Sequence, residues 1–406
     1  MRVLHTSDWH LGRLLYGQKR HHEFAAFLDW LHQCVIDQGI DILLVAGDIF
    51  DTNTPGNQAQ QLYYRFLARL SLTECRHVVV IGGNHDSPSF LDAPGSLLKA
   101  LNVHVIGEAC ADPRDAVLAL EYQGQLEAIV CAVPYLRERD LRRVSDGESA
   151  ADKDTKLIAG VREHYQAAAD YAQSLRGAAE VPIIGMGHLF ITGGQLQEGD
   201  GVRELYVGSL GQVPLAMLPS FDYLALEHLH MPQKVGGVEH IRYSGSPVAM
   251  GFGEVGQQKV VLQIEFHGRV PSITALEIPV FQTKARVRGD LAELKVQLSA
   301  LIAEQKSVWV EVEYTGDASV NELRHQLAEM VEGSEVAILR VRNKQRREQA
   351  LSRTLSETSL AELSPAEVFQ RRLALEQMDE TRQARMTELH QQVLQAMQEA
   401  DTHADS

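Results

Sequence analysis

The sequence predicts an α/β fold, and three observations support this prediction. Through the N-terminal part of the chain, apolar runs of strand length alternate with helices whose apolar residues recur on one face. Five such runs end abruptly in a short segment that carries a carboxylate, amide or imidazole side chain. A shorter alternation of strands and helices follows residue 280. The order strand, helix, strand is typical of a βαβ unit, which places parallel strands in one sheet.

The first elements form such a unit. Residues 3 to 7 predict a short strand, and its exit carries Asp8 and His10. A helix with one apolar face follows, and it leads into a buried strand that ends at Gly47 and Asp48. The apolar face of that helix consists of Phe24, Phe27, Leu28, Leu31 and Val35.

The next repeat has the same order. A helix with an apolar face over residues 62–70 precedes a strand over 77–81, which ends in Gly82-Gly83-Asn84-His85-Asp86. Glycines there allow a sharp turn as the chain leaves the sheet. Short strands and turns are expected between about 103 and 135, and a polar segment follows over 134–140. Its arginines are either phosphate contacts or part of a solvated helix face.

A helix near 155–176 leads to two more strands with histidines at their ends. The strand over 182–186 carries His188, and the strand over 223–226 carries His228 and His230. Because strand side chains alternate, residues two apart lie on one face, so both of the latter imidazoles are expected to point into one pocket. Strands over 241–243 and 259–266 complete a second sheet.

The C-terminal part divides into three further segments after a domain over residues 1–279. Residues 280–342 alternate as strand, helix, strand, helix, strand and predict a small α/β domain. Residues 343–358 are polar and predict a linker, and residues 359–406 predict two helices. Ser364-Pro365-Ala366-Glu367 has the order of a capping box, with proline in the first helical position. The apolar faces of these helices pack either on the parent domain or on another protein.

Composition limits the classes of function. A chain of 406 residues is expected to hold two or three domains. Its formal net charge of −16 is unusual for a nucleic-acid enzyme, because affinity for a duplex comes largely from Lys and Arg on phosphates. Contact with DNA must then be local, assisted by metal or shared with a basic partner; the alternative is an acidic protein that binds no nucleic acid.

Cysteine usage and hydropathy indicate the compartment. The four cysteines have no C-x-x-C spacing and lie in or beside apolar segments, which favours reduced core thiols. No apolar run approaches the roughly 18 residues of a membrane helix, and the N-terminus enters a strand without a signal-peptide core. We therefore expect a soluble cytoplasmic protein with no membrane contact.

The side chains at the strand ends predict a two-metal site with Asp48 as the shared ligand. Carboxyl ends of strands are where open α/β sheets gather ligands. Two divalent ions carry four positive charges, and Asp8 and Asp48 return two negative ones, so the site stays positive toward a phosphodiester. Two ions about 3.5–4 Å apart can lower the pKa of a bridging water and stabilise in-line displacement. Mixed carboxylate, amide and imidazole ligands suit manganese, iron or zinc.

The ordered set of motifs resembles the calcineurin-like metallophosphoesterase superfamily. These motifs are D-x-H at Asp8, G-D-x-x-D at Asp48, G-N-H-D at Asn84, G-H at His188 and H-x-H at His228. The flanks, such as Leu4-His5-Thr6-Ser7-Asp8-Trp9-His10-Leu11-Gly12 and Arg242-Tyr243-Ser244-Gly245-Ser246-Pro247, resemble more narrowly the SbcD exonuclease subunits, bacterial relatives of the eukaryotic recombination nuclease.

The resemblance implies a role for each site residue. The first metal would be held by Asp8, His10, Asp48 and His230, and the second by Asp48, Asn84, His188 and His228. His85 would be the catalytic histidine that approaches the scissile phosphate and stabilises or protonates the leaving 3′ oxygen. Asp51 and Asp86 would orient imidazoles.

The chain departs from the family pattern at one position. The family usually has Gly-His-x-His in its last motif, whereas this chain has Glu227-His228-Leu229-His230. Strand alternation predicts that Glu227 points away from the metals. If the position requires a positive φ angle, however, glutamate is strained there and the second metal binds weakly.

The resemblance also implies a fold, a partner and an activity. The fold would be a two-sheet sandwich flanked by helices, followed by a small domain over 280–342 that helps to position DNA. The C-terminal helices would bind an SbcC-like coiled-coil ATPase, and two nuclease subunits would dimerise within a heterotetramer. The implied activity is manganese-dependent exonuclease and hairpin endonuclease cleavage in DNA repair and recombination. The alternatives are a phosphoesterase with another substrate and a weakly active scaffold for the ATPase.

Overall fold

The structure is a computed structural model that describes residues 1–141, 150–192, 213–316, 320–343 and 385–386. The chain divides into two compact units. The first comprises Met1–Arg286, Lys306–Val310 and Glu335–Leu339, and the second comprises Val287–Gln305, Glu311–Ser334 and the chain from Arg340. The predicted linker and C-terminal helices lie outside the described residues except at 343 and 385–386.

The first unit holds two six-stranded sheets. In the first sheet, β1, β2, β3 and β4 are parallel, whereas β11 pairs antiparallel with β1 and with β12. Its order is β12 (Val270–Glu277), β11 (Val260–His267), β1 (Arg2–Thr6), β2 (Ile42–Val45), β3 (His77–Ile81) and β4 (Val103–Ile106). The parallel strands place the exits of β1, β2 and β3 at the same edge.

In the second sheet, β6, β7, β8 and β10 are parallel and the two outer strands are antiparallel to their neighbours. Its order is β5 (Val117–Tyr122), β6 (Gln125–Ala132), β7 (Ile183–His188), β8 (Tyr223–Glu227), β10 (Val238–Tyr243) and β9 (Gln233–Val235). The exits of β7 and β8 therefore also lie at one edge.

Alternation along the strands packs the two sheets into a sandwich. Ile42 and Leu44 of β2 belong to a buried cluster shared with Ile184 and Met186 of β7 on the other sheet. Leu43, in contrast, belongs to the cluster that includes helix α1. Full burial of each such side chain stabilises the fold by about 1.5–3 kcal/mol. The run of β2 is apolar throughout, and that of β7 is apolar up to His188, because both faces of these strands are buried.

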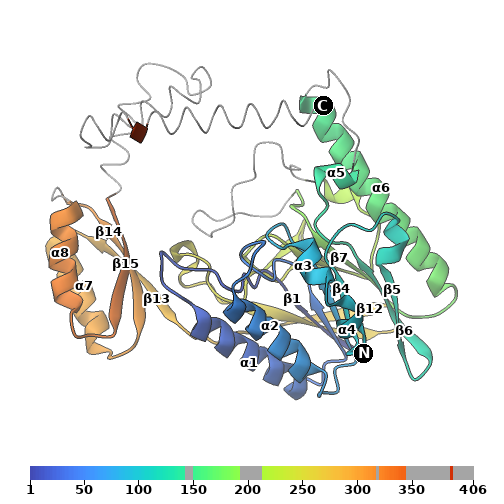
Figure 1. Ribbon diagram of the computed structural model, residues 1–406, viewed down its shortest axis with the longest axis horizontal. Coiled ribbons are helices and arrows are strands. Elements are labelled where there is room, and N and C mark those ends of the chain that lie inside the picture. The colour runs from blue at the N-terminus through green and yellow to red at the C-terminus, as the bar shows by residue number, and fades with distance from the viewer. Residues whose placement is uncertain (142–149, 193–212, 317–319, 344–384, 387–406) are drawn as a thin grey trace. The chain divides into compact units, whose positions relative to one another are not determined.

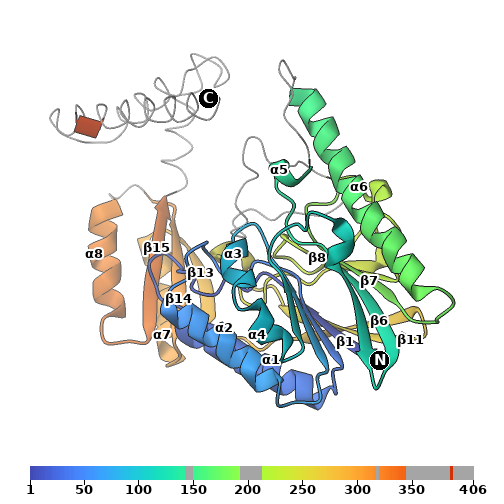
Figure 2. The same cartoon turned by 45° about the vertical axis from the view of Figure 1, so that its right-hand side comes forward.

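Helices cover the outer faces of both sheets (Figure 1). Helices α1 (His21–Asp37) and α2 (Asn57–Leu70) pack on the first sheet, and α6 (Ala150–Arg176) packs on the second. Figure 2 shows α6 and the α1–α2 pair on separate sides of the sandwich. This is the expected two-sheet α/β sandwich flanked by helices.

Short helices connect these elements. They are α3 (Pro88–Asp92), α4 (Gly95–Lys99) and α5 (Glu138–Leu141), with 3-10 turns at Pro113–Ala116, Leu215–Met217 and Phe252–Glu254.

A third sheet of three strands follows, in the order β13 (Thr283–Gly289), β14 (Val308–Tyr314) and β15 (Val336–Asn343). Helices α7 (Leu291–Ala303) and α8 (Val320–Val331) connect its strands. The Asp290 side chain accepts hydrogen bonds at the start of α7, and the Glu293 side chain accepts one from the Asp290 amide, which completes a capping box. The element types match the predicted alternation over 280–342.

Among the helices of the described residues, none is long and apolar enough to cross a membrane.

Candidate metal centre

Five strand exits bring the predicted site residues together. The exits of β1, β2 and β3 carry Asp8, Asp48 and Asn84, and backbone hydrogen bonds tie neighbouring exits to one another. The Asp8 amide donates to the Gly47 carbonyl (3.1 Å), and the His10 amide donates to the Asp48 carbonyl (2.9 Å). The ends of β7 and β8 on the second sheet supply the remaining histidines.

The backbone is strained where it presents these ligands. Asp8, His10 and Asp48 have φ angles of 50°, 47° and 46°, in the left-handed region. Such conformations cost on the order of 1–3 kcal/mol each and persist where surrounding structure holds them, often at functional sites.

The first group of candidate ligands consists of Asp8, His10 and His230, each with a ligand atom within 4.8 Å of the others. His10 Nε2 lies 3.2 Å from His230 Nε2 and 3.6 Å from Asp48 Oδ2. Burial, together with the neighbouring imidazole of His230, lowers the pKa of His10 well below its usual value. The imidazole is therefore neutral, as a metal ligand must be.

The second group is centred on Asp48 and His188, whose ligand atoms lie within 4.8 Å of each other and of Glu227. The His188 ring lies 5.0 Å from the His228 ring between centroids. Burial lowers the pKa of both imidazoles, that of His228 to about 4. The Asn84 Oδ1 atom is buried without a hydrogen-bond partner among the described residues. Asp48 thus lies between the two groups.

His85 lies beside the first group. Its ring centroid is 4.8 Å from that of His10, and its Nδ1 is 2.8 Å from the Asp51 carbonyl oxygen. A carbonyl oxygen only accepts, so this contact assigns the hydrogen to Nδ1. The Asp51 carboxylate lies 3.5 Å from His10 Nδ1 and 3.3 Å from Arg13 Nη1. Asp51 therefore contacts two imidazoles, one through its carbonyl and one through its side chain.

Asp86 has contacts that differ from the expected ones. Its carboxylate accepts hydrogen bonds from the backbone amides of Ile49 (3.1 Å), Phe50 (2.9 Å) and Gly83 (2.9 Å). These partners are backbone amides and not imidazoles. Asp86 thus links the loop after β2 to the loop after β3. The backbone amides of these short loops have no strand partner, and the buried carboxylate accepts their hydrogen bonds.

Glu227 also differs from the expectation. We expected its side chain to point away from the metals, but its carboxylate contacts His188 Nδ1 and its side chain is fully buried. His188 and Glu227 pair in register on parallel strands, so their side chains leave the same face. The positive φ angle of 105° falls on His228, not on Glu227. Strand β8 ends at Glu227, so His228 and His230 reach the site from a loop and not by strand alternation.

Glu254 is a site residue that the sequence analysis missed. Its Oε1 lies 3.6 Å from His230 Nδ1, while its Oε2 pairs with Lys259 and accepts from the Met250 amide (3.1 Å). Burial, the largest single cause, raises the pKa of Glu254, but Lys259 and His230 together outweigh it and hold this pKa below its usual value. The residue lies in a 3-10 turn, and its sequence neighbourhood contains no motif that predicts a contact with His230.

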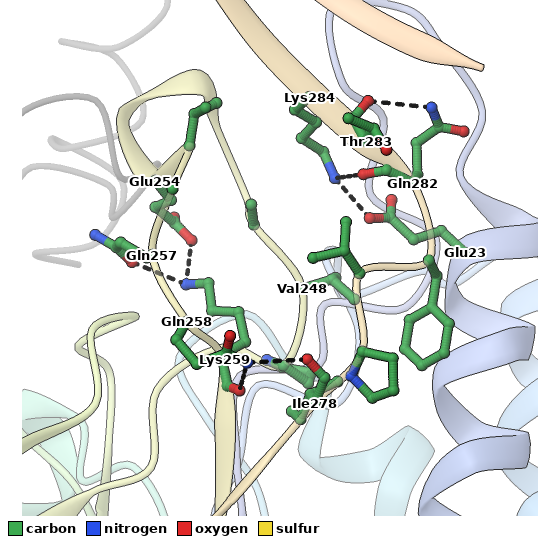
Figure 3. Close-up of a pocket in the computed structure, with 17 residues that line it drawn as sticks. Glu23, Val248, Glu254, Gln257, Gln258, Lys259, Ile278, Gln282, Thr283 and Lys284 are labelled. Carbon is green, nitrogen blue, oxygen red and sulfur yellow. Dashed lines mark hydrogen bonds and ion pairs between the residues drawn. The ribbon is translucent and has the colours of Figure 1, made fainter. Parts of the chain in front are cut away.

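The same carboxylate lines a separate cavity of about 260 Å³ (Figure 3). The charged side chains around this cavity pair with one another. Lys259 binds Glu254, and Lys284 Nζ lies 2.5 Å from Glu23 Oε1. Glu254 therefore connects this wall of the cavity to His230, because its carboxylate contacts both Lys259 and the His230 ring.

The donor set fits divalent cations. Asp8, Asp48 and Glu227 are all at most 2% exposed, and among the described residues no Lys or Arg forms an ion pair with them. Burial and the neighbouring charges of Asp86 and Asp8 raise the pKa of Asp48 well above its usual value. Buried carboxylates without a cation are costly, whereas carboxylate, amide and neutral imidazole together are good ligands for Mn²⁺, Fe²⁺ or Zn²⁺.

Tyr135 and Arg137 lie next to the second group. The Tyr135 ring is 5.1 Å from the His188 ring, and Arg137 Cζ is 5.9 Å from the Tyr135 centroid. Arg137 Nη1 is buried and has no hydrogen-bond partner among the described residues. An anionic group at the centre could satisfy that donor.

Two family models match the sequence. The model described as "Calcineurin-like phosphoesterase" matches residues 1–132, and the model described as "Type 5 capsule protein repressor C-terminal domain" matches residues 280–377.

Curated relatives match most of the chain, and each is named as the SbcD component of the nuclease SbcCD. The Escherichia coli K12 relative is 39% identical over 393 residues, which are 96% of each chain. The Rhodobacter capsulatus relative is 33% identical over 74% of this chain and 76% of its own length. The Bacillus subtilis relative is 37% identical over 65% of this chain and 66% of its own length.

Proposed function

The chain belongs to the SbcD family of nuclease components, which carry a calcineurin-like phosphoesterase domain, and from this premise we propose that it hydrolyses DNA phosphodiester bonds at the metal centre. The observation that carries this proposal is the meeting of two buried ligand groups around Asp48, one with His10 and one with His188. Two separate groups that share a carboxylate are what a two-metal phosphodiesterase requires.

The proposed ligands are those implied by the family motifs. Asp8, His10, Asp48 and His230 hold the first ion, and Asp48, Asn84, His188 and His228 hold the second; we propose Mn²⁺ for both. When bound, the two ions activate the attacking water and stabilise the charge of in-line displacement. Asp51 and Glu254 orient His10 and His230 through their Nδ1 atoms, which directs the Nε2 atoms inward.

His85 acts on the leaving group. Its Nδ1 donates to the Asp51 carbonyl, which fixes the ring, and we assign Nε2 as the atom that acts on the substrate. A protonated Nε2 within hydrogen-bond distance of the leaving 3′ oxygen stabilises or protonates it. Arg137, next to Tyr135, binds a phosphate of the same strand.

The proposed substrates are DNA ends, cleaved as a double-strand exonuclease, and single-strand or hairpin DNA, cleaved as an endonuclease. An acidic chain with a net charge of −16 holds duplex DNA poorly by itself. An SbcC-like coiled-coil ATPase, bound through residues 359–406, would supply basic surface. We propose that two nuclease subunits form a homodimer within this heterotetramer, in the cytoplasm, and that residues 280–342 help to position DNA.

A nuclease assay tests this proposal. The protein is incubated with Mn²⁺ and a duplex, a hairpin, a phosphopeptide or a cyclic nucleotide, with and without the co-expressed ATPase. The proposal expects cleavage of duplex and hairpin DNA that requires Mn²⁺ and is stronger with the ATPase. Turnover of the phosphopeptide or cyclic nucleotide alone would favour another phosphoesterase, and metal binding without turnover would favour a scaffold.

A further inference from the structure

Glu227 occupies a position inside the metal centre. It ends β8 with a fully buried side chain, and its carboxylate contacts His188 Nδ1. A Glu227 carboxylate oxygen, one ring nitrogen of His188 and an Asp48 oxygen lie within 4.8 Å of one another. The three side chains therefore surround one point in the way that ligands surround an ion.

The backbone at Gly47 leaves room for the Glu227 carboxylate because glycine has no β-carbon. A β-carbon added to Gly47 would overlap Glu227 Oε1, and Gly47 itself has a φ angle of 99° that favours glycine. The glutamate thus fills the space directly above the turn that presents Asp48. Its position is fixed by the β7–β8 register on one side and by this turn on the other.

Glu227 differs in its partners from the other buried glutamates nearby. Glu254 has Lys259 and the Met250 amide, and Glu23 has Arg20 and Lys284. Glu227 Oε2 has no hydrogen-bond partner among the described residues, and no Lys or Arg of that part of the chain pairs with it. A buried carboxylate that faces a neutral imidazole leaves a negative charge that a cation would compensate.

We propose that Glu227 is an additional carboxylate ligand of the second ion, beside Asp48 and His188. This inference rests on the proposed two-metal centre. With Asp8, Asp48 and Glu227, three negative charges face the four positive charges of two divalent ions. The centre therefore binds its second ion more tightly than a centre with glycine at this position. The extra oxygen ligand also favours hard ions such as Mn²⁺ and Mg²⁺.

Manganese titration of the full chain tests the proposal. Calorimetry and electron paramagnetic resonance measure the number and affinity of bound Mn²⁺ ions in the wild type, Glu227→Gln and Glu227→Gly. The control is Glu23→Gln, which removes a buried carboxylate that is paired elsewhere. We expect two ions in the wild type and in the control, and a loss of at least tenfold in the affinity of the weaker ion in both Glu227 variants.

Thermal unfolding gives an independent readout. Without metal, Glu227→Gln should melt at a higher temperature than the wild type, because it removes an uncompensated buried charge. With Mn²⁺, the wild type should gain more than the variant, because a ligand stabilises the state that binds it. This melting curve also shows whether the variant folds.

Two results would overturn the inference alone, and a third would also overturn the two-metal centre on which it rests. Unchanged Mn²⁺ affinity in Glu227→Gly would show that the carboxylate is not a ligand, and tighter binding would show that it opposes occupancy. If the wild type itself bound no Mn²⁺, the two-metal centre would fail, and this inference would fail with it. The wild-type titration therefore separates the two failures.

Discussion

His10 Nε2 lies 3.2 Å from His230 Nε2, although the two residues are 220 positions apart in the sequence and come from different sheets. On the far side of each ring, a carboxylate faces Nδ1: Asp51 at 3.5 Å for His10 and Glu254 at 3.6 Å for His230. Two imidazoles that are each backed by a carboxylate and face each other are arranged to share one cation.

His85→Ala is expected to separate metal binding from catalysis. His85 touches the Asp51 carbonyl and is not among the proposed ligands, so both Mn²⁺ ions should remain when it is removed. Loss of a general acid typically costs about 10²- to 10⁴-fold in rate. Metal analysis of the purified variant and a hairpin cleavage assay measure the two properties. Near-normal cleavage would refute the assigned role.

Glu254→Gln is expected to weaken the first metal position without removing a ligand. His230 loses the charge that favours one ring orientation, and such changes typically cost about 10- to 100-fold in metal affinity or activity. Mn²⁺ titration measures the effect. The double variant Glu254→Gln/Lys259→Met serves as the control, since it avoids leaving Lys259 unpaired. Recovery of full affinity in that variant would assign the effect to the lysine instead.

Arg137→Ala is expected to impair use of DNA. An uncompensated guanidinium donor beside Tyr135 fits a phosphate, and a hydrogen bond to a charged group is worth about 1.5–3 kcal/mol, which corresponds to roughly 10- to 100-fold in kcat/KM. Arg139→Ala is the matched control, because the Arg139 side chain is exposed and lies 3.5 Å from Asp140. Steady-state kinetics on duplex DNA should show a loss for Arg137 alone; equal losses would contradict a specific phosphate contact.

Lys284 is expected to make stability depend on alkaline pH. Burial, with the nearby charge of Arg20, lowers the pKa of Lys284 from its usual 10.5 to about 8, although Glu23 opposes this shift. Between these pH values the unfolded chain binds more protons than the folded chain, so the free energy of unfolding contributed by this group rises with pH. Below about pH 8 the folded chain holds Lys284 charged, and the full free-energy cost of burying that charge lowers the stability.

Lys284→Met removes the ammonium group and, with it, the contribution of this residue to the pH dependence of the free energy of unfolding. Urea unfolding at pH 7.5 and at pH 10 should show the wild type gaining stability relative to the variant as pH rises. Glu23 keeps Arg20 as a partner in the variant. Parallel pH profiles for the two proteins would show that Lys284 keeps its usual pKa when folded.

Local patterns predicted the elements well where both faces or one face of the element are buried. The strands that lead to Asp48, Asn84 and His188 contain short apolar runs over residues 42–45, 78–81 and 183–186, and the length of these runs and the turn residues after them favour buried strands over helices. Their polar ends predicted a common site because parallel strands release their exits at one edge. The α/β class followed from the same alternation.

Features that depend on contacts between distant segments could not be predicted from local sequence patterns. The expectation that residues 259–266 belong to the second sheet is wrong, because β11 pairs with β1 in the first sheet across more than 250 residues, and no local signal predicts that antiparallel pairing. The direction of Glu227 depends on its register with His188, and the contact of Glu254 with His230 depends on a turn that folds back. The amides that bind Asp86 likewise become neighbours only in the folded chain.

Anomalous diffraction from crystals grown with Mn²⁺ tests the central proposal most directly. Data collected at the manganese edge should show two peaks, one among Asp8, His10 and His230 and the other among Asp48, His188 and Glu227. A map with no peak at these residues, or with its peaks elsewhere on the molecule, would contradict the two-metal centre.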